Sequence, residues 1–448
     1  MSLTGSTVGN GTSPAVIHES ESPPAGSLAA RLATALAAAS VRYCQWKGAW
    51  KRAHWSVGEG DIDLLVDRGS RAAFDRVMSD LGFRPILPEP AFGIPGAVSW
   101  LAPDPDGDRL IHVHAHYQLF AGKAWTTLLH IPIERPTLQS ASRGPWFDVP
   151  APEYELLLLV LQSTLRHHWR DLFRRGDPGW LTSLQAHLRR LDAEADRYEL
   201  AAIVEQFLPE LSPLCLGRCR VALRAGVAPL KRLAARRELL WQLRLRTRRA
   251  PAGVTLRRAA YGLQSVLLSQ LNRATGKRAS PHGMKRLATG GAVIALAGPD
   301  GAGKSTCAAA LYRWLGAELC ACHAHLGRPP RSATTLITGA ALKTSRAIDR
   351  ARRLTRPSAR TAHLELLRFV ATARDRYRLY CRVTRFATHG GIAICERYPI
   401  SEEHVLVGPS WVQDRGMAAM GRLAAWLRRI EAGYYQRIAA PDLIVILR

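Results

Sequence analysis

The sequence predicts an α/β protein with more than one domain, and three observations lead to this fold class. Residues 291–311 read as a short buried strand, a glycine-rich turn and a helix, which is the unit of parallel sheets. Residues 61–66 and 110–119 alternate polar and apolar side chains, as strands of a second sheet would. Residues 152–211 have helical periodicity. With 448 residues, the chain is too long for one ordinary core.

The composition is that of a globular protein with an unusually basic surface. Hydrophobic residues make up 47% of the chain and charged residues 22%, which excludes an intrinsically disordered protein. The formal net charge is +26, mostly from arginine. Such a charge favours anionic partners: nucleotides, nucleic acid or an acidic membrane face. An arginine-rich composition spread over every surface explains the same number equally well.

We expect a cytoplasmic protein without a transmembrane segment. The eight cysteines form no C-x-x-C pair, which is typical of reduced thiols in the cytosol. Residues 1–26 show no basic start followed by an apolar stretch, so no signal peptide is predicted. The longest apolar runs, 156–161 and 292–297, are far shorter than the ~20 residues of a membrane-spanning helix.

The first half begins with a tail and continues into an α+β domain at 27–150. Residues 1–26 are rich in Ser, Thr, Gly and Pro, and we expect them to be disordered. Residues 27–40 predict a helix capped by Ser27. A second helix is expected from Arg71 to Leu81, closed by Gly82.

Two carboxylates and three histidines stand on the predicted strands of this domain. Asp61 and Asp63 are two residues apart on a strand, so their side chains share a face, with Cα atoms roughly 6.6 Å apart. Such a pair can hold a divalent metal, and the metal can hold a triphosphate. His112, His114 and His116 share a face of the second strand.

A helical region follows at 151–273, and a linker at 274–290 separates it from the second half. Residues 218–258 contain thirteen Arg or Lys and a single acid. This stretch is either a patch for nucleic acid or a membrane, or an arginine-coated connecting layer. We favour the layer, because it offers few aromatic side chains for stacking on bases.

The second half, 291–448, opens with a phosphate-binding loop. The motif G-x-x-x-x-G-K-[ST] lies between a predicted strand and a predicted helix, the context that this loop requires. Glycines let successive N–H groups point at an anion, and the helix adds its positive dipole end. Lys304 is expected on the β- and γ-phosphates of ATP, and the Ser305 hydroxyl on Mg²⁺. The nucleotide-binding residues are Gly298, Asp300, Gly301, Ala302, Gly303, Lys304, Ser305 and Thr306.

This half resembles the thymidylate kinases and their relatives. The resemblance is carried by the loop, by Glu396-Arg397-Tyr398 after a predicted strand, by 373–377 (ARDRY) in a helical stretch, and by 441–447 (PDLIVIL). It implies a parallel sheet and transfer of the ATP γ-phosphate to a nucleoside monophosphate or related phosphorylated small molecule.

The same resemblance assigns roles to individual residues. It places Asp300 on the acceptor sugar, Arg376 and Arg397 on the acceptor phosphate, and Glu396 at Mg²⁺. Arg328 is a further acceptor contact. Two structural alternatives stand beside these roles: Arg376 lies on a solvated helix face, and Glu396 pairs with Arg397 at the end of the strand.

Residues 30–210 resemble a group of uncharacterised bacterial nucleotidyltransferases. The resemblance rests on Lys47-Gly48, on 61–66 (DIDLLV) and on 167–172 (HHWRDL). It places Gly48 in the turn that faces the triphosphate, and Asp61 and Asp63 in the metal site. His114 stands where that fold usually supplies a third carboxylate.

An imidazole does not replace a carboxylate on Mg²⁺, so three interpretations of this domain stay open. The domain is catalytic with an altered metal, or it binds nucleotide with little or no turnover. In the third interpretation His112, His114 and His116 form a transition-metal site with the aspartates, because imidazole suits Zn²⁺.

Relatives of the kinase-like half continue beyond the position of Arg448 with an arginine-rich lid and a further strand. We therefore expect an incomplete sheet, and three explanations stay open: the gene product is truncated, the protein binds nucleotide but turns it over poorly, or an arginine from 343–360 takes the place of the lid arginines. The leading functional hypothesis is a thymidylate kinase-like enzyme that uses ATP and Mg²⁺. The alternatives are a nucleotidyltransferase at Asp61 and Asp63 regulated by the P-loop domain, and a non-catalytic nucleotide-binding module.

Overall fold

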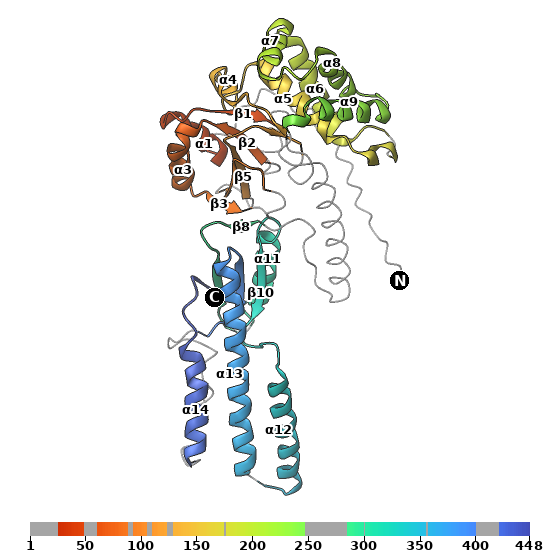
Figure 1. The fold of residues 1–448 in the computed structure, drawn as a ribbon. Helices are drawn as coiled ribbons and strands as arrows, with labels where there is room; N and C mark the ends of the chain where they lie inside the picture. Colours follow the sequence, from red (N-terminus) through yellow and green to blue (C-terminus); the bar gives the residue numbers. More distant parts are fainter. Residues whose placement is uncertain are drawn as a thin grey trace, which may run out of the picture. The chain divides into compact units, whose positions relative to one another are not determined.

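The chain forms two compact units in the computed structural model (Figure 1). The first unit comprises Met1–Pro85 and Pro90–Thr275, and the second comprises Ile86–Glu89 and Gly276–Arg448. The structure describes residues 26–48, 61–87, 93–104, 110–122, 129–173, 176–246, 285–299, 301–354, 357–399 and 421–448. Most of the predicted tail and of the 274–290 linker therefore lies outside the described residues, and the domain boundaries predicted from the sequence stay predictions.

A mixed sheet forms the centre of the first unit. Its strands lie in the order β1-β2-β5-β4-β3, in which β2 and β5 are parallel, while β1 and β4 run antiparallel to their partners. All residues of β2 after Asp61 are buried, which confirms the predicted core strand. The strands are β1 (Tyr43–Lys47), β2 (Asp61–Val66), β3 (Arg84–Leu87), β4 (Ala97–Pro103) and β5 (Leu110–His116). The boundary between the units falls within β3, so that its Ile86 and Leu87 belong to the second unit.

Two helices bury their apolar faces in the core of this sheet. Helix α1 (Leu28–Ala38) starts at Ser27, whose hydroxyl accepts a hydrogen bond from the Ala30 N–H, as predicted for a cap. It buries Leu28, Leu32 and Leu36, which recur every four residues. Helix α3 (Arg71–Asp80) follows the short 3₁₀ turn η2 (Arg68–Ser70), and the chain leaves it through Gly82 at φ +83°.

A helical layer completes the first unit. Helix α5 is buried on almost every side, which explains why its sequence is apolar at successive positions rather than on one stripe. A short hairpin of β6 (Phe120–Ala121) and β7 (Leu129–His130) precedes the layer. The helices are α4 (Glu134–Gln139), α5 (Pro152–Arg166), η3 (Trp169–Phe173), α6 (Gly179–Glu194), α7 (Arg197–Phe207), α8 (Pro213–Ala222), α9 (Pro229–Gln242) and η4 (Arg244–Arg246).

Several arginines of this layer are engaged inside it. Arg232 is 2% exposed and ion-pairs with Asp177 at 2.6 Å. Three further pairs join neighbouring helices and turns: Arg218–Glu238, Arg220–Asp192 and Arg246–Glu210. These contacts tie the described part of 218–258 to the rest of the layer. Residues 247–258 lie outside the described part, and both interpretations of the stretch stay predictions.

The second unit contains a four-stranded parallel sheet, as the sequence predicts. Its order is β10-β11-β9-β12, and each neighbouring pair is parallel. The short strand β8 (Arg286–Leu287) pairs with Ile86 and Leu87, which belong to the same unit. The sheet strands are β9 (Ala292–Ala297), β10 (Ala321–His325), β11 (Ile392–Glu396) and β12 (Leu443–Ile446).

Four long helices accompany this sheet. Helix α11 (Lys304–Leu315) follows β9 directly and packs against β10 and β11. Helix α13 (Ala359–Thr388) packs between α12 (Ala333–Ala351) and α14 (Gly421–Gln436) (Figure 1). Within the described part of the chain, none of the helices combines the length and apolar character needed to cross a bilayer.

Candidate functional sites

The first candidate site is the turn between β9 and α11 in the second unit. Gly298, Gly301 and Gly303 have φ values of +144°, +91° and +77°, a region that side chains with a Cβ rarely adopt. Gly298 is also close to another strand end, because a Cβ there would lie 2.4 Å from the Leu447 carbonyl oxygen. Gly303 is the N-cap of α11, so the motif's glycines bring the chain directly into the helix N-terminus.

Lys304 and Ser305 begin α11 and face the turn and the neighbouring strand. The Lys304 ammonium donates to the carbonyl oxygens of Gly298 and Pro299, at 2.9 and 2.5 Å. It therefore arches back over the loop, where the resemblance places a phosphate. Ala302 and Thr306 lie within the loop and the first helical turn, and Asp300 falls outside the described residues.

Glu396 ends β11 and lies directly across from the loop. Its Oε2 accepts a hydrogen bond from the Ser305 hydroxyl at 2.6 Å, and its Oε1 lies 2.7 Å from the His323 Nε2 on β10. Burial favours the neutral acid, but the bonds from Ser305 and His323 outweigh it and lower the pKa of Glu396. A buried carboxylate thus shares a hydrogen bond with the motif's hydroxyl, and the assignment of both residues to Mg²⁺ stays a prediction.

Arg376, predicted to hold the acceptor phosphate, is buried and bound to the backbone. It is 7% exposed, and its Nε donates to the Leu326 carbonyl oxygen at 2.8 Å. Its guanidinium also contacts the Gly327 carbonyl and the Tyr435 hydroxyl. The solvated helix face considered for Arg376 is therefore wrong, and its contacts hold the loop after β10 in place.

The other two predicted acceptor arginines flank the same edge of the sheet. Arg397 follows Glu396 with φ +50°, and its side chain lies against Gly327, where a Cβ would come 2.8 Å from the Arg397 Cδ. Arg328 is exposed on the loop after β10, and its backbone N–H donates to the His325 Nδ1. The alternative in which Glu396 simply pairs with Arg397 does not describe its contacts, because the Glu396 carboxylate is hydrogen-bonded to Ser305 and His323.

A basic pocket of about 500 Å³ lies between α13 and the loop after β10. Among the described residues, four arginines line it, and Asp375 is the only acidic lining residue. Asp375 is itself occupied by the Ser332 N–H and the Thr335 hydroxyl. This pocket was not predicted from the sequence, although the spacing of three of the arginines along α13 puts them on one helix face. The arginines are Arg331, Arg378, Arg382 and Arg385.

The second candidate site is the histidine-lined face of β2 and β5 in the first unit. The parallel register sets Asp61 beside His112 and Asp63 beside His114. The His112 Nδ1 lies 2.5 Å from the Asp61 Oδ1. The Asp63 Oδ1 is contacted by the His114 Nδ1 at 3.3 Å and the His116 Nε2 at 3.1 Å.

Lys47 on β1 completes the surroundings of Asp63. Its Nζ lies 3.0 Å from the same Oδ1 that the histidines contact. Burial opposes ionisation, but the Lys47 charge and the bonds from the two histidines hold the pKa of Asp63 well below its usual range. Gly48 follows at φ +83°; the residues after it, 49–60, lie outside the described residues, so its place in a turn that faces a triphosphate stays a prediction.

Asp61 and His116 differ in their access to solvent. The Asp61 side chain is 47% exposed, and the bond and charge of His112 outweigh burial to lower its pKa to about 2. His116 is 1% exposed, and burial lowers its pKa to about 4 despite its bond to Asp63. The two aspartates fall into separate clusters with histidines, so the nucleotidyltransferase interpretation stays a prediction.

No protein-family model and no curated protein matches this chain.

Proposed function

We propose that the second unit is an ATP-dependent phosphotransferase whose acceptor is a small anionic molecule. One observation carries the proposal: the hydroxyl of the G-x-x-x-x-G-K-S loop is hydrogen-bonded to a buried carboxylate at the end of the adjacent parallel strand. Phosphoryl transfer depends mainly on alignment and on neutralising charge. A glycine loop, a helix N-terminus, an ammonium and a hydroxyl–carboxylate pair supply these functions together.

The residues present fit ATP and Mg²⁺. The loop N–H groups and the N-terminus of α11 attract phosphate oxygens, and the Lys304 ammonium can leave the two loop carbonyls for a phosphate. Ser305 and Glu396 present oxygen ligands, the type that Mg²⁺ prefers. The metal supplies neutralisation of the phosphate charge when bound. Glu396 orients the Ser305 hydroxyl, and His323 in turn orients Glu396.

The basic pocket supports an anionic acceptor. Its walls come from α13 and from the loop after β10, a loop that Arg376 ties to α13. Arginine guanidinium groups bind phosphate and carboxylate groups through paired hydrogen bonds. A nucleoside monophosphate or a related phosphorylated molecule carries the negative charge that such a pocket attracts.

The test is ADP formation from Mg-ATP across a panel of phosphorylated acceptors, with the full chain. We expect turnover with at least one acceptor and its loss in Lys304→Ala. A matched control is Lys343→Ala, which removes a lysine from α12. Unchanged nucleotide binding in Lys304→Ala would contradict the proposal, as would an absence of turnover with every acceptor.

A further inference from the structure

The histidine-lined face of β2 and β5 has a chemistry that phosphoryl transfer in the second unit does not use. Two adjacent parallel strands place the carboxylates of β2 beside the imidazoles of β5 on one face. Two groups of three bring their donor atoms within 4.8 Å of one another: Asp61 with His112 and His114, and Asp63 with His114 and His116.

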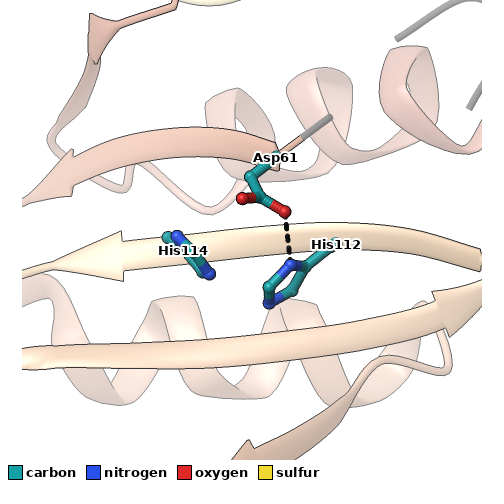
Figure 2. A group of neighbouring side chains, drawn as sticks. All are labelled: Asp61, His112 and His114. Carbon is teal, nitrogen blue, oxygen red and sulfur yellow. Dashed lines mark hydrogen bonds and ion pairs between the residues drawn. The ribbon is translucent and has the colours of Figure 1, made fainter. Parts of the chain in front are cut away.

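We propose that Asp61, His112 and His114 bind a divalent transition metal ion. Figure 2 shows the three side chains on one side of the two strands, with Asp61 joined to His112 and the His114 ring beside them. The rings of His112 and His114 meet edge to face, with centroids 4.2 Å apart. Two imidazoles and one carboxylate leave coordination positions open to water or a ligand.

The Asp63 group is the weaker candidate, and Lys47 is the reason. The Lys47 ammonium already lies 3.0 Å from the Asp63 Oδ1 and supplies the positive charge that a metal would bring. A metal at Asp63 would have to displace this ammonium or sit beside it against charge repulsion. His116 is also 1% exposed, so a hydrated ion would lose its water shell to reach it.

Asp61 is the more accessible of the two carboxylates. Its side chain is 47% exposed, against 10% for Asp63. None of the contacts described for the Lys47 ammonium involves Asp61. His112 is held in place by burial, with a side chain 6% exposed, and His114 is intermediate at 21%. The group therefore combines a fixed imidazole with a carboxylate that solvent can reach.

Small side-chain movements bring the three groups to coordination distances. Ligand atoms at about 2.0–2.1 Å around a tetrahedral ion lie roughly 3.3 Å from one another. The Asp61 Oδ1 and His112 Nδ1, now 2.5 Å apart, would separate slightly as the ion replaces the shared proton. The half-exposed Asp61 side chain can make this movement without disturbing the sheet.

The donor set determines the class of metal. Neutral imidazole suits Zn²⁺, Fe²⁺, Ni²⁺ and Cu²⁺, whereas Mg²⁺ prefers oxygen ligands throughout. The proposed site is therefore distinct from a Mg²⁺ site on the two aspartates. Asp61 and Asp63 belong to different groups of neighbouring ligand atoms, and this arrangement does not favour a shared Mg²⁺ ion.

The experiment is titration of the metal-stripped full chain with Zn²⁺ by calorimetry and with Co²⁺ by visible absorption. We expect a saturable site that is weakened at least 10-fold by Asp61→Asn and by His114→Gln. The matched control, His130→Gln, removes a half-exposed histidine that bonds Glu134 elsewhere in the unit. It should bind as the wild type does.

Three results would overturn the proposal. The first is no saturable Zn²⁺ binding at all, and the second is Zn²⁺ binding that Asp61→Asn and His114→Gln leave unchanged. The third is loss of the ion in Asp63→Asn with full binding in Asp61→Asn, which would move the site to the other group. Far-UV circular dichroism of each variant separates loss of ligand from loss of fold, and the half-exposed Asp61 makes its variant the least disruptive.

Discussion

Glu396→Gln is expected to destabilise the second unit by about 2 kcal/mol at pH 7. The substitution keeps the size of the side chain and its ability to hydrogen-bond. Its amide oxygen can still accept from the His323 Nε2, and the Ser305 hydroxyl can turn to accept from the amide N–H. What is lost is the charge in two contacts of 2.6 and 2.7 Å. A charge-assisted hydrogen bond contributes about 1 kcal/mol more to stability than a neutral one, so the loss of charge in both contacts gives about 2 kcal/mol.

The pH dependence of this difference follows from the lowered pKa of Glu396. A carboxyl whose folded pKa is below its unfolded value stabilises the fold fully above the unfolded value, and this contribution is lost as pH falls through the folded pKa. The difference in the free energy of unfolding between wild type and Glu396→Gln should therefore have its full value at pH 7 and become smaller below about pH 4.5. Equilibrium urea unfolding, followed by circular dichroism, measures it.

A double-mutant cycle with Ser305→Ala isolates the contact that the proposed function depends on. We expect a coupling free energy of about 1 kcal/mol between the two positions. Mg-ATP should also raise the unfolding midpoint of the wild type more than that of Glu396→Gln. Superimposable unfolding curves for wild type and Glu396→Gln at pH 7 would refute the reasoning, because they would mean that the charge of Glu396 adds nothing to its two hydrogen bonds.

Three further substitutions test other parts of the structure. Gly291→Ala should lower the free energy of unfolding by about 4 kcal/mol or prevent folding, because its Cβ would lie 1.7 Å from the Gly391 carbonyl oxygen. The control Gly339→Ala has open space around its Cβ in α12 and should raise the free energy of unfolding by about 0.5–1 kcal/mol; urea unfolding measures both. Burial lowers the pKa of His167 to about 4. As pH falls, the unfolded chain therefore protonates at this histidine before the folded chain does, and the free energy of unfolding should fall by up to about 3 kcal/mol between about pH 6.5 and pH 4. His167→Gln should flatten that part of the urea-unfolding profile, and an unchanged profile would contradict the assignment. Arg382→Gln should raise the acceptor KM roughly 10- to 100-fold with the affinity for ATP unchanged, and an unchanged KM would remove the pocket from the acceptor site.

The turn between β9 and α11 could be predicted from the sequence because its determinants are local. Glycines at Gly298, Gly301 and Gly303 permit the positive φ values that the turn needs, and all lie within a few residues of the helix that they start. The contact between Ser305 and Glu396 spans most of the second half, yet it was also foreseeable. Parallel strands end at the same edge of a sheet, so an acid that ends one strand lies near the loop that follows its neighbour.

The surroundings of Asp63 and Arg376 could not be predicted in the same way. Lys47 reaches Asp63 because β1 pairs antiparallel with β2 and carries an irregularity between Gln45 and Lys47. A shift by one residue would turn that lysine to the other face. Arg376 stands among arginines of similar spacing, and only the packing of α13 determines which of them is buried against Leu326 and Gly327.

The two candidate sites differ in their ligand atoms, which makes their metals separable by experiment. Ser305 and Glu396 offer oxygen atoms, whereas Asp61, His112 and His114 offer two imidazoles and a carboxylate. A chelator selective for Zn²⁺ over Mg²⁺ should therefore strip the β2–β5 face and leave Mg-ATP-dependent transfer unchanged, while EDTA in excess of Mg²⁺ should abolish transfer. Two results together would show that the sites are coupled: the wild type loses phosphoryl transfer on selective chelation of Zn²⁺, and Asp61→Asn keeps it under the same conditions. That outcome would require the state of the histidine-lined face to alter the P-loop, and the separate ligand sets give no reason to expect it.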